Sequence, residues 1–150
     1  MSDGGVLAAL LAVAGVLVLL AVVYYVCIAI AGWKIFAKAG EAGWKALIPL
    51  YNVYIMYKIG WKGMFFFVWF ALAAVYSFLA GQGASNPSTM MTALTGLVSL
   101  LTFGVRLIQN LKLSKAFGHG TGFGLGLTFL TPIFLLILGF GSSQYQGPQA

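Results

Sequence analysis

Charged residues are scarce in this chain of 150 residues, and almost all of the charge it has is positive. Only 7% of the residues are charged, against 61% that are hydrophobic, and the acids are limited to Asp3 and Glu41. A soluble domain normally devotes about a quarter of its residues to charge, because polar surface has to cover its core. The shortage therefore excludes a soluble globular protein and predicts a single membrane domain, 1–150.

Histidine and cysteine are also too few to build most catalytic or metal sites. His119 is the only histidine and Cys27 the only cysteine, so the chain lacks the residues for a disulfide or a multi-ligand metal site. The two acids are predicted to lie on opposite sides of the membrane, which rules out a carboxylate pair. We therefore expect no enzyme, no catalytic residue, no cofactor and no metal.

Long apolar runs are abundant, and four of them have the length of a membrane-spanning helix. Roughly 20 residues cross the hydrocarbon core at 1.5 Å per residue. The predicted spans are about residues 4–32, 63–81, 88–110 and 121–140. Ser88 can cap the third helix, and Pro132 is expected to kink the fourth. The sequence thus predicts an all-α integral membrane protein with four transmembrane helices.

Lysine and arginine are confined to one side of these predicted spans. Five lie between the first two spans and two between the last two, with Arg106 nearby, whereas both tails and the turn at 81–87 carry none. The positive-inside rule then places the basic segments in the cytoplasm and both termini outside the cell membrane. This placement favours membrane lipids, and not nucleic acid, as partners of the basic residues.

The connection at 33–62 is apolar where a loop should be polar. Its uncharged stretch 46–57 would make about 18 Å of helix, which is too short to span. We interpret 33–62 as an interfacial amphipathic helical segment on the inner leaflet. The alternative is a shallow re-entrant hairpin that turns at Pro49 or Asn52. The predicted membrane-interface residues of both basic segments are Trp33, Lys34, Lys38, Trp44, Lys45, Tyr51, Tyr54, Tyr57, Lys58, Trp61, Lys62, Arg106, Lys112 and Lys115.

Small residues recur at helical spacing in the first and fourth predicted spans. Such stripes let a neighbouring backbone approach closely, either within the chain or in a second copy. The second use predicts a homo-oligomer. A flexible lead into the fourth span is the simpler explanation of the glycines around His119. The candidate packing residues are Gly118, Gly122, Gly126, Gly120, Gly124, Ala8, Ala12 and Gly15.

Two stretches resemble a known family. Residues 34–57, KIFAKAGEAGWKALIPLYNVYIMY, resemble the KAGE-GW-LIP-YN segment of a family of small prokaryotic membrane proteins of unknown function. Residues 113–145, LSKAFGHGTGFGLGLTFLTPIFLLILGFGSSQY, look like that family's KAFGKG, GLxLLP and GFG-xxY signature. The resemblance implies a multispan fold without an assigned activity, although members are sometimes labelled signal-peptidase-like.

The residues themselves speak against a serine and lysine peptidase. Such an enzyme needs a serine hydroxyl about 3 Å from a neutral lysine amine. The serines of the turn 81–87 and of the C-terminal tail are predicted to lie about 30 Å from the lysines, across the hydrocarbon. Ser114 lies on the lysine side, but adjacent helical residues such as Lys115 do not face one another.

Two classes of function remain. A self-associating structural or scaffold component is favoured by three features: the small-residue stripes, the aromatic interfacial segment and the lack of an ionisable cluster. Its possible partners include other membrane proteins. Only hydroxyls and Arg106 lie within the spans, and such hydroxyls usually bond back to their own helix. A pore or transport component formed between subunits is therefore the alternative.

Overall fold

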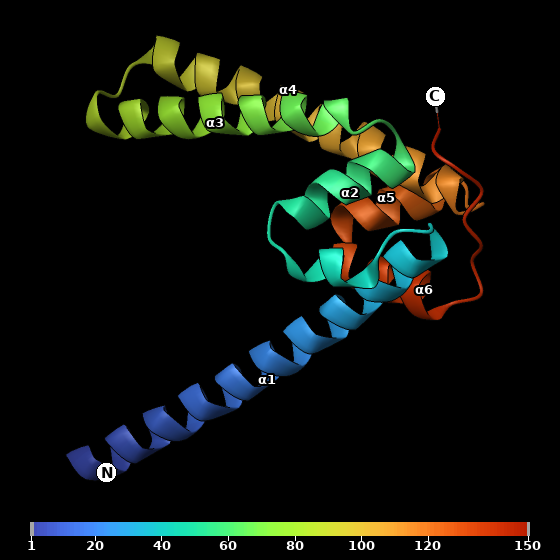
Figure 1. Ribbon diagram of the computed structural model, residues 1–150. Coiled ribbons are helices and arrows are strands. Elements are labelled where there is room, and N and C mark those ends of the chain that lie inside the picture. Colours follow the sequence, from blue (N-terminus) through green and yellow to red (C-terminus); the bar gives the residue numbers. More distant parts are fainter. Residues whose placement is uncertain (1, 150) are drawn as a thin grey trace.

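The computed structural model describes residues 2–149, which form helices and no strand, so the all-α prediction is confirmed (Figure 1). The helices are α1 (Asp3–Lys38), the 3-10 helix η1 (Gly43–Leu47), α2 (Tyr51–Gly60), α3 (Met64–Ser85), α4 (Thr89–Ala116), α5 (Thr121–Phe129) and α6 (Thr131–Phe140). In Figure 1, α1 and the α3–α4 hairpin diverge as two arms from a compact group. We call that group the body: α1 from Ala31, η1, α2, α4 from Gln109, α5, α6 and the tail 141–149.

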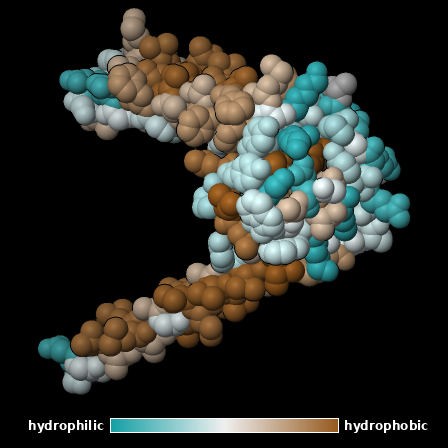
Figure 2. Space-filling model, viewed as in Figure 1, coloured by the Kyte–Doolittle hydropathy of each residue, from teal (hydrophilic) through white to brown (hydrophobic). Residues whose placement is uncertain are grey.

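The two arms hold the three helices that are long and apolar enough to cross a membrane, α1, α3 and α4. They contain the first three predicted spans. No residue in the most apolar window of α1 is buried, and Figure 2 shows hydrophobic surface along both arms. Soluble proteins rarely expose contiguous apolar surface of this extent. The arms are therefore suited to lipid.

The fourth predicted span, 121–140, does not form one kinked helix, and this part of the prediction is corrected. Helices α5 and α6 have 9 and 10 residues and meet at Leu130, which has non-helical backbone angles. Pro132 cannot donate a backbone hydrogen bond, so it ends one helix and fits the first turn of the next. Phe134 of α6 then packs directly against Gly126 of α5, so the chain folds back as a hairpin.

The C-terminal tail returns to the start of this hairpin. Ser143 Oγ lies 2.6 Å from His119 Nε2, and the tail continues along α4 and α2. Gln146 N–H donates to the Ala116 carbonyl at 2.6 Å, and Tyr145 O–H donates to the Ile59 carbonyl at 2.7 Å. The tail is thus part of the body, at the end of the molecule that carries the lysines.

A second, smaller hairpin is formed by η1 and α2 within the predicted interfacial segment. The chain turns at 48–50, where Leu50 has a positive φ of 64°. The side-chain amide of Asn52 donates to the Ala46 carbonyl at 3.3 Å across this turn. The segment is therefore helical, as expected, and it turns at Pro49, one of the two positions that the re-entrant alternative requires.

The core lies in the body, where five helices contribute apolar side chains. Gly139 lets the backbone of α6 approach that of α1 closely, because a Cβ on Gly139 would lie 2.7 Å from the Ala31 carbonyl oxygen. The buried cluster consists of Ile35, Phe36, Ile55, Ile59, Leu113, Ala116, Phe117, Leu127 and Leu138.

Candidate functional site: the polar face of α4

Seven polar residues of α4, from Thr92 to Asn110, form one stripe along the helix. At 100° per residue their positions fall within about 100° of arc. Much of the remaining surface of α4 is apolar, so the helix has two chemically distinct faces. The stripe consists of Thr92, Thr95, Ser99, Thr102, Arg106, Gln109 and Asn110.

The end of the stripe nearest the body is bonded to neighbouring helices. The Gln109 amide nitrogen donates to the Met56 carbonyl at 2.6 Å, and the Asn110 amide nitrogen donates to Thr128 Oγ1 at 3.1 Å. Gly60 leaves room for the Gln109 side chain, since a Cβ there would lie 2.9 Å from its nitrogen. This end of the stripe therefore holds α4 to α2 and α5.

Two buried polar atoms in this region have no hydrogen-bond partner among the described residues: Gln109 Oε1 and the Tyr57 hydroxyl. Burial raises the pKa of Tyr57 well above its usual range, and the positive charge of Arg106 opposes that rise only in part. Tyr57 was predicted to lie at the membrane interface, but its side chain is 3% exposed and packs inside the protein. The amphipathic pattern of the segment around Tyr57 does not distinguish a side chain at the membrane interface from one in the protein interior.

The end of the stripe away from the body is open. Together with residues of α3 it lines a groove of about 460 Å³. A Cβ on Gly96 would meet no described atom within 4 Å, so nothing in residues 2–149 fills the groove at that point. Thr95 and Thr102 each donate to a carbonyl four residues earlier, as expected. The groove residues are Tyr76, Ala80, Gly83, Met91, Thr92, Thr95, Gly96 and Ser99.

The predicted basic interface residues gather at the body end of the molecule, and Figure 2 shows a hydrophilic surface there. Glu41 lies among them and pairs with Lys45 and Lys58, each at 2.6 Å. Hydrogen bonds from these two ammonium groups lower the pKa of Glu41. Of the predicted aromatic residues, Tyr51 stacks on Tyr54.

Lys38, one of the predicted membrane-interface residues, bonds to the C-terminal end of α6. Its ammonium donates to the carbonyls of Leu138 at 2.7 Å and Gly141 at 2.8 Å. These carbonyls lie at the C-terminal end of α6, where a cation satisfies unpaired acceptors and the helix dipole. The sequence carries no signal for this contact, because the partners lie about 100 residues apart.

The predicted glycine stripe is used in part within the chain. Gly124 packs against Leu111 of α4, with 2.9 Å from a built Cβ to the Leu111 Cα, and Gly126 packs against Phe134. Around Gly120 and Gly122 a Cβ would meet no described atom within 4 Å, and Gly118 takes a positive φ of 78°.

In α1 the small-residue surface is unfilled. A Cβ on Gly15 would meet no described atom within 4 Å, and Ala8 and Ala12 are exposed.

The four-span topology predicted that the tail serines lie about 30 Å from the lysines. The structure instead places them at the same end of the molecule as the lysines. Ser143 lies in the body, where its hydroxyl meets His119, and the His119 ring stacks on Phe123 with centroids 4.0 Å apart. The pair closes the base of the α5–α6 hairpin. Among residues 2–149, no group of three or more His, Cys, Asp or Glu side chains could hold a metal ion.

Comparison with known proteins identifies a family. No curated protein and no solved structure matches the chain. One family model, described as a family of unknown function (DUF5684), matches residues 44–148, which is more than two thirds of the chain. The match includes most of the body and the whole α3–α4 arm. The chain therefore belongs to this family of unknown function, as its resemblance to such a family had predicted.

Proposed function

We propose that this protein is a non-enzymatic, self-associating component of a membrane assembly, in which copies meet through the polar face of α4 and the small-residue surface of α1. The observation that carries the proposal is the open half of the α4 stripe. Hydroxyls that face hydrocarbon find no further partner there, and polar side chains of membrane helices usually face other protein or a water-filled cavity. A second copy would cover them.

The small-residue surface of α1 is the partner that we assign to the groove. Ala8, Ala12 and Gly15 lie in the half of α1 away from the body, and the groove lies in the corresponding half of the α3–α4 arm (Figure 1). The two surfaces would thus stand at similar depth in the bilayer. Because they differ from one another, the contact is heterologous and builds a ring or an open array.

The proposed topology has three spans, α1, α3 and α4, with the body on the cytoplasmic side. The N-terminus then lies outside and the tail inside, which replaces the earlier expectation of two outside termini. The α5–α6 hairpin enters the bilayer from the cytoplasm and returns. Thr131 Oγ1 donates to the Leu127 carbonyl at 2.7 Å, which satisfies an α5 end group without water.

The exposed side chains at the two turns support shallow insertion of both hairpins. Phe129 is 69% exposed at the α5–α6 turn, and Leu50 is 53% exposed at the η1–α2 turn. Cysteines introduced at Ser2 and Gln149 in a Cys27→Ser background test this topology. Membrane-impermeant maleimide should label the first in intact cells and the second only after lysis; equal labelling in intact cells contradicts three spans.

Two matched pairs of variants test the assembly. Ala12→Leu changes the small-residue surface, whereas Ala14→Leu makes the same change about 200° around the helix. Gly96→Leu fills the groove, whereas Gly104→Leu also meets open space but lies outside it. Native mass measurement in detergent should show fewer oligomers for the first member of each pair only. A monomeric wild type, or equal effects within each pair, contradicts the proposal.

A pore between copies is the second candidate, and the continuity of the α4 stripe is the observation that favours it. Arg106 continues the row of hydroxyls, so copies facing one another through this stripe would enclose a polar path. Ion flux into proteoliposomes should then fall with Arg106→Ala. Oligomers without flux support the scaffold and exclude the pore.

A further inference from the structure

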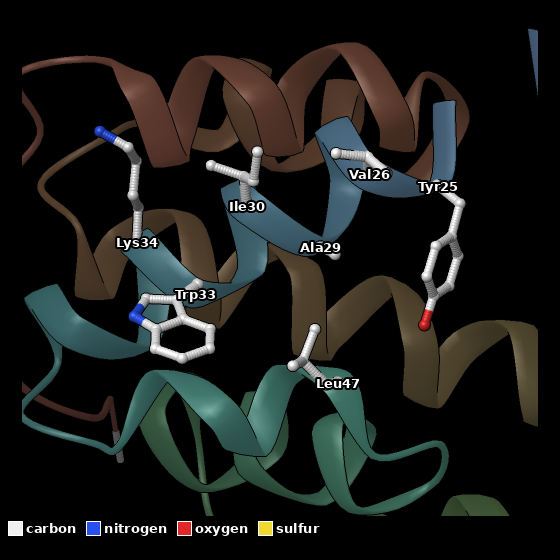
Figure 3. Close-up of a pocket in the computed structure, with 7 residues that line it drawn as sticks. All are labelled: Tyr25, Val26, Ala29, Ile30, Trp33, Lys34 and Leu47. Carbon is white, nitrogen blue, oxygen red and sulfur yellow. The ribbon is translucent and has the colours of Figure 1, made fainter. Parts of the chain in front are cut away.

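We propose that a slot between α1 and η1 binds one anionic phospholipid of the inner leaflet, with an acyl chain in the slot and the headgroup at Lys34. The slot has a volume of about 460 Å³ (Figure 3). Figure 3 shows Leu47 of η1 facing the side chains of α1. The residues that line it are Tyr25, Val26, Ala29, Ile30, Trp33, Lys34 and Leu47.

The shape of the slot suits an extended chain. Tyr25, Ala29 and Trp33 lie one helical turn apart, so two aromatic rings stand on either side of a small residue. Eight residues of helix separate the rings by about 12 Å, and half of the hydrocarbon core measures about 15 Å. The slot therefore matches the depth of one leaflet. Its lining is apolar apart from Lys34 and the polar ends of the two aromatic side chains, as an acyl chain requires.

Close packing of η1 against α1 holds the wall of the slot in place. Any Cβ on Gly43 would collide with the Trp33 ring, so glycine at this position allows the indole to lie against η1. A Cβ on Gly32 would lie 3.1 Å from the Ala46 Cβ, which shows a second close contact between the two helices. The slot is thus preformed in the protein and does not need the lipid to shape it.

Charge complementarity selects an anionic headgroup. The Lys34 stem lines the slot, and in Figure 3 its ammonium points away from Leu47. This ammonium lies 5.0 Å from the centre of the Phe140 ring and is exposed to the headgroup region. Neither acid competes for it, because Asp3 is at the other end of α1 and Glu41 is paired with two lysines. A lipid phosphate fits this position.

Native mass spectrometry of the purified full chain tests the slot. Wild type incubated with equal amounts of phosphatidylglycerol and phosphatidylcholine should retain one phosphatidylglycerol in preference. Ala29→Leu fills the slot and should reduce that adduct about tenfold, the loss expected when about two methylenes lose contact. Ala14→Leu, the same change on an exposed part of α1, should leave the adduct unchanged.

A charge variant separates the headgroup from the chain. Lys34→Gln should bring phosphatidylglycerol retention down to the phosphatidylcholine level, and thermal unfolding of each variant in detergent checks that the body is intact. Equal retention of the two lipids by wild type overturns the proposal that the site selects an anionic headgroup. An unchanged adduct in folded Ala29→Leu overturns the proposal that the acyl chain lies in the slot. The lipid adduct is measured on the monomer peak, so this test does not depend on self-association.

Discussion

The two ends of α1 both carry large apolar side chains, but in opposite surroundings. From Val6 to Val26 its large apolar side chains are exposed, whereas Ala31, Ile35 and Phe36 are 0% exposed. The difference comes from the partners, since η1 and α6 pack only on the C-terminal end. In a membrane the exposed part gains no hydrophobic free energy by leaving lipid for protein of equal apolarity, so any contact it makes there depends on close packing. The comparison teaches that this protein concentrates its internal stability in the body and leaves its arms for the bilayer.

Leucine truncation at one site in each region gives the largest expected difference. Leu127 is 1% exposed in the core, and Leu17 is 60% exposed on the α1 arm. Leu127→Ala should lower the free energy of unfolding by about 2–5 kcal/mol, because it removes buried contacts and leaves a cavity. Leu17→Ala should change it by less than about 0.5 kcal/mol. Chemical unfolding in mixed detergent micelles measures both, and equal effects contradict the comparison.

Adding a methyl group should break the contact between α6 and α1. Gly139→Ala places a Cβ 2.8 Å from the Ala31 Cα, so the helices must separate, at a cost of about 1–3 kcal/mol. Gly104→Ala on the α4 arm meets open space and should be neutral or slightly stabilising, since alanine favours helix. The melting temperatures of the two variants in detergent measure this difference. A neutral Gly139→Ala would mean that the close approach contributes nothing.

Removal of one ammonium group should loosen the base of the α5–α6 hairpin. Lys38→Met keeps an apolar stem but leaves the Leu138 and Gly141 carbonyls without this donor, at a cost of about 1–3 kcal/mol. The control is Lys62→Met, at an exposed position between α2 and α3. Hydrogen exchange of α6 amides should rise in the first variant only. Unchanged exchange in Lys38→Met would remove the proposed capping role.

The Glu41 ion pairs should give the smallest effect, and one that depends on pH. Because the pKa of Glu41 is lowered in the folded protein, its contribution is complete above the unfolded value of about 4.5 and is lost as pH falls through the folded value. Glu41→Gln should therefore lower the melting temperature slightly at pH 7 and not at all in strong acid. Asp3→Gln, at the far end of α1, is the control. A difference that persists at low pH contradicts the ion-pair origin.

Much of the fold followed from local pattern. Three apolar runs, 4–32, 63–81 and 88–110, are long enough to span, and they match α1, α3 and α4 to within one residue at their starts. Length and charge are properties of neighbouring residues, so a single sequence reveals them. The hydroxyls of the α4 stripe are visible in the same way, because they are spaced three and four residues apart.

The sequence alone determined the helical class, the three helices that are long and apolar enough to span, the gathering of basic residues at one end and the family. Only the tertiary structure decided the course of 121–140 and of the tail. An apolar run of 20 residues with a proline has the length to cross, and nothing local says whether its halves continue or fold back. Contacts with Leu111, Lys38 and Ala31, remote in sequence, accompany the return. Such contacts depend on where other helices lie, and no local pattern records that.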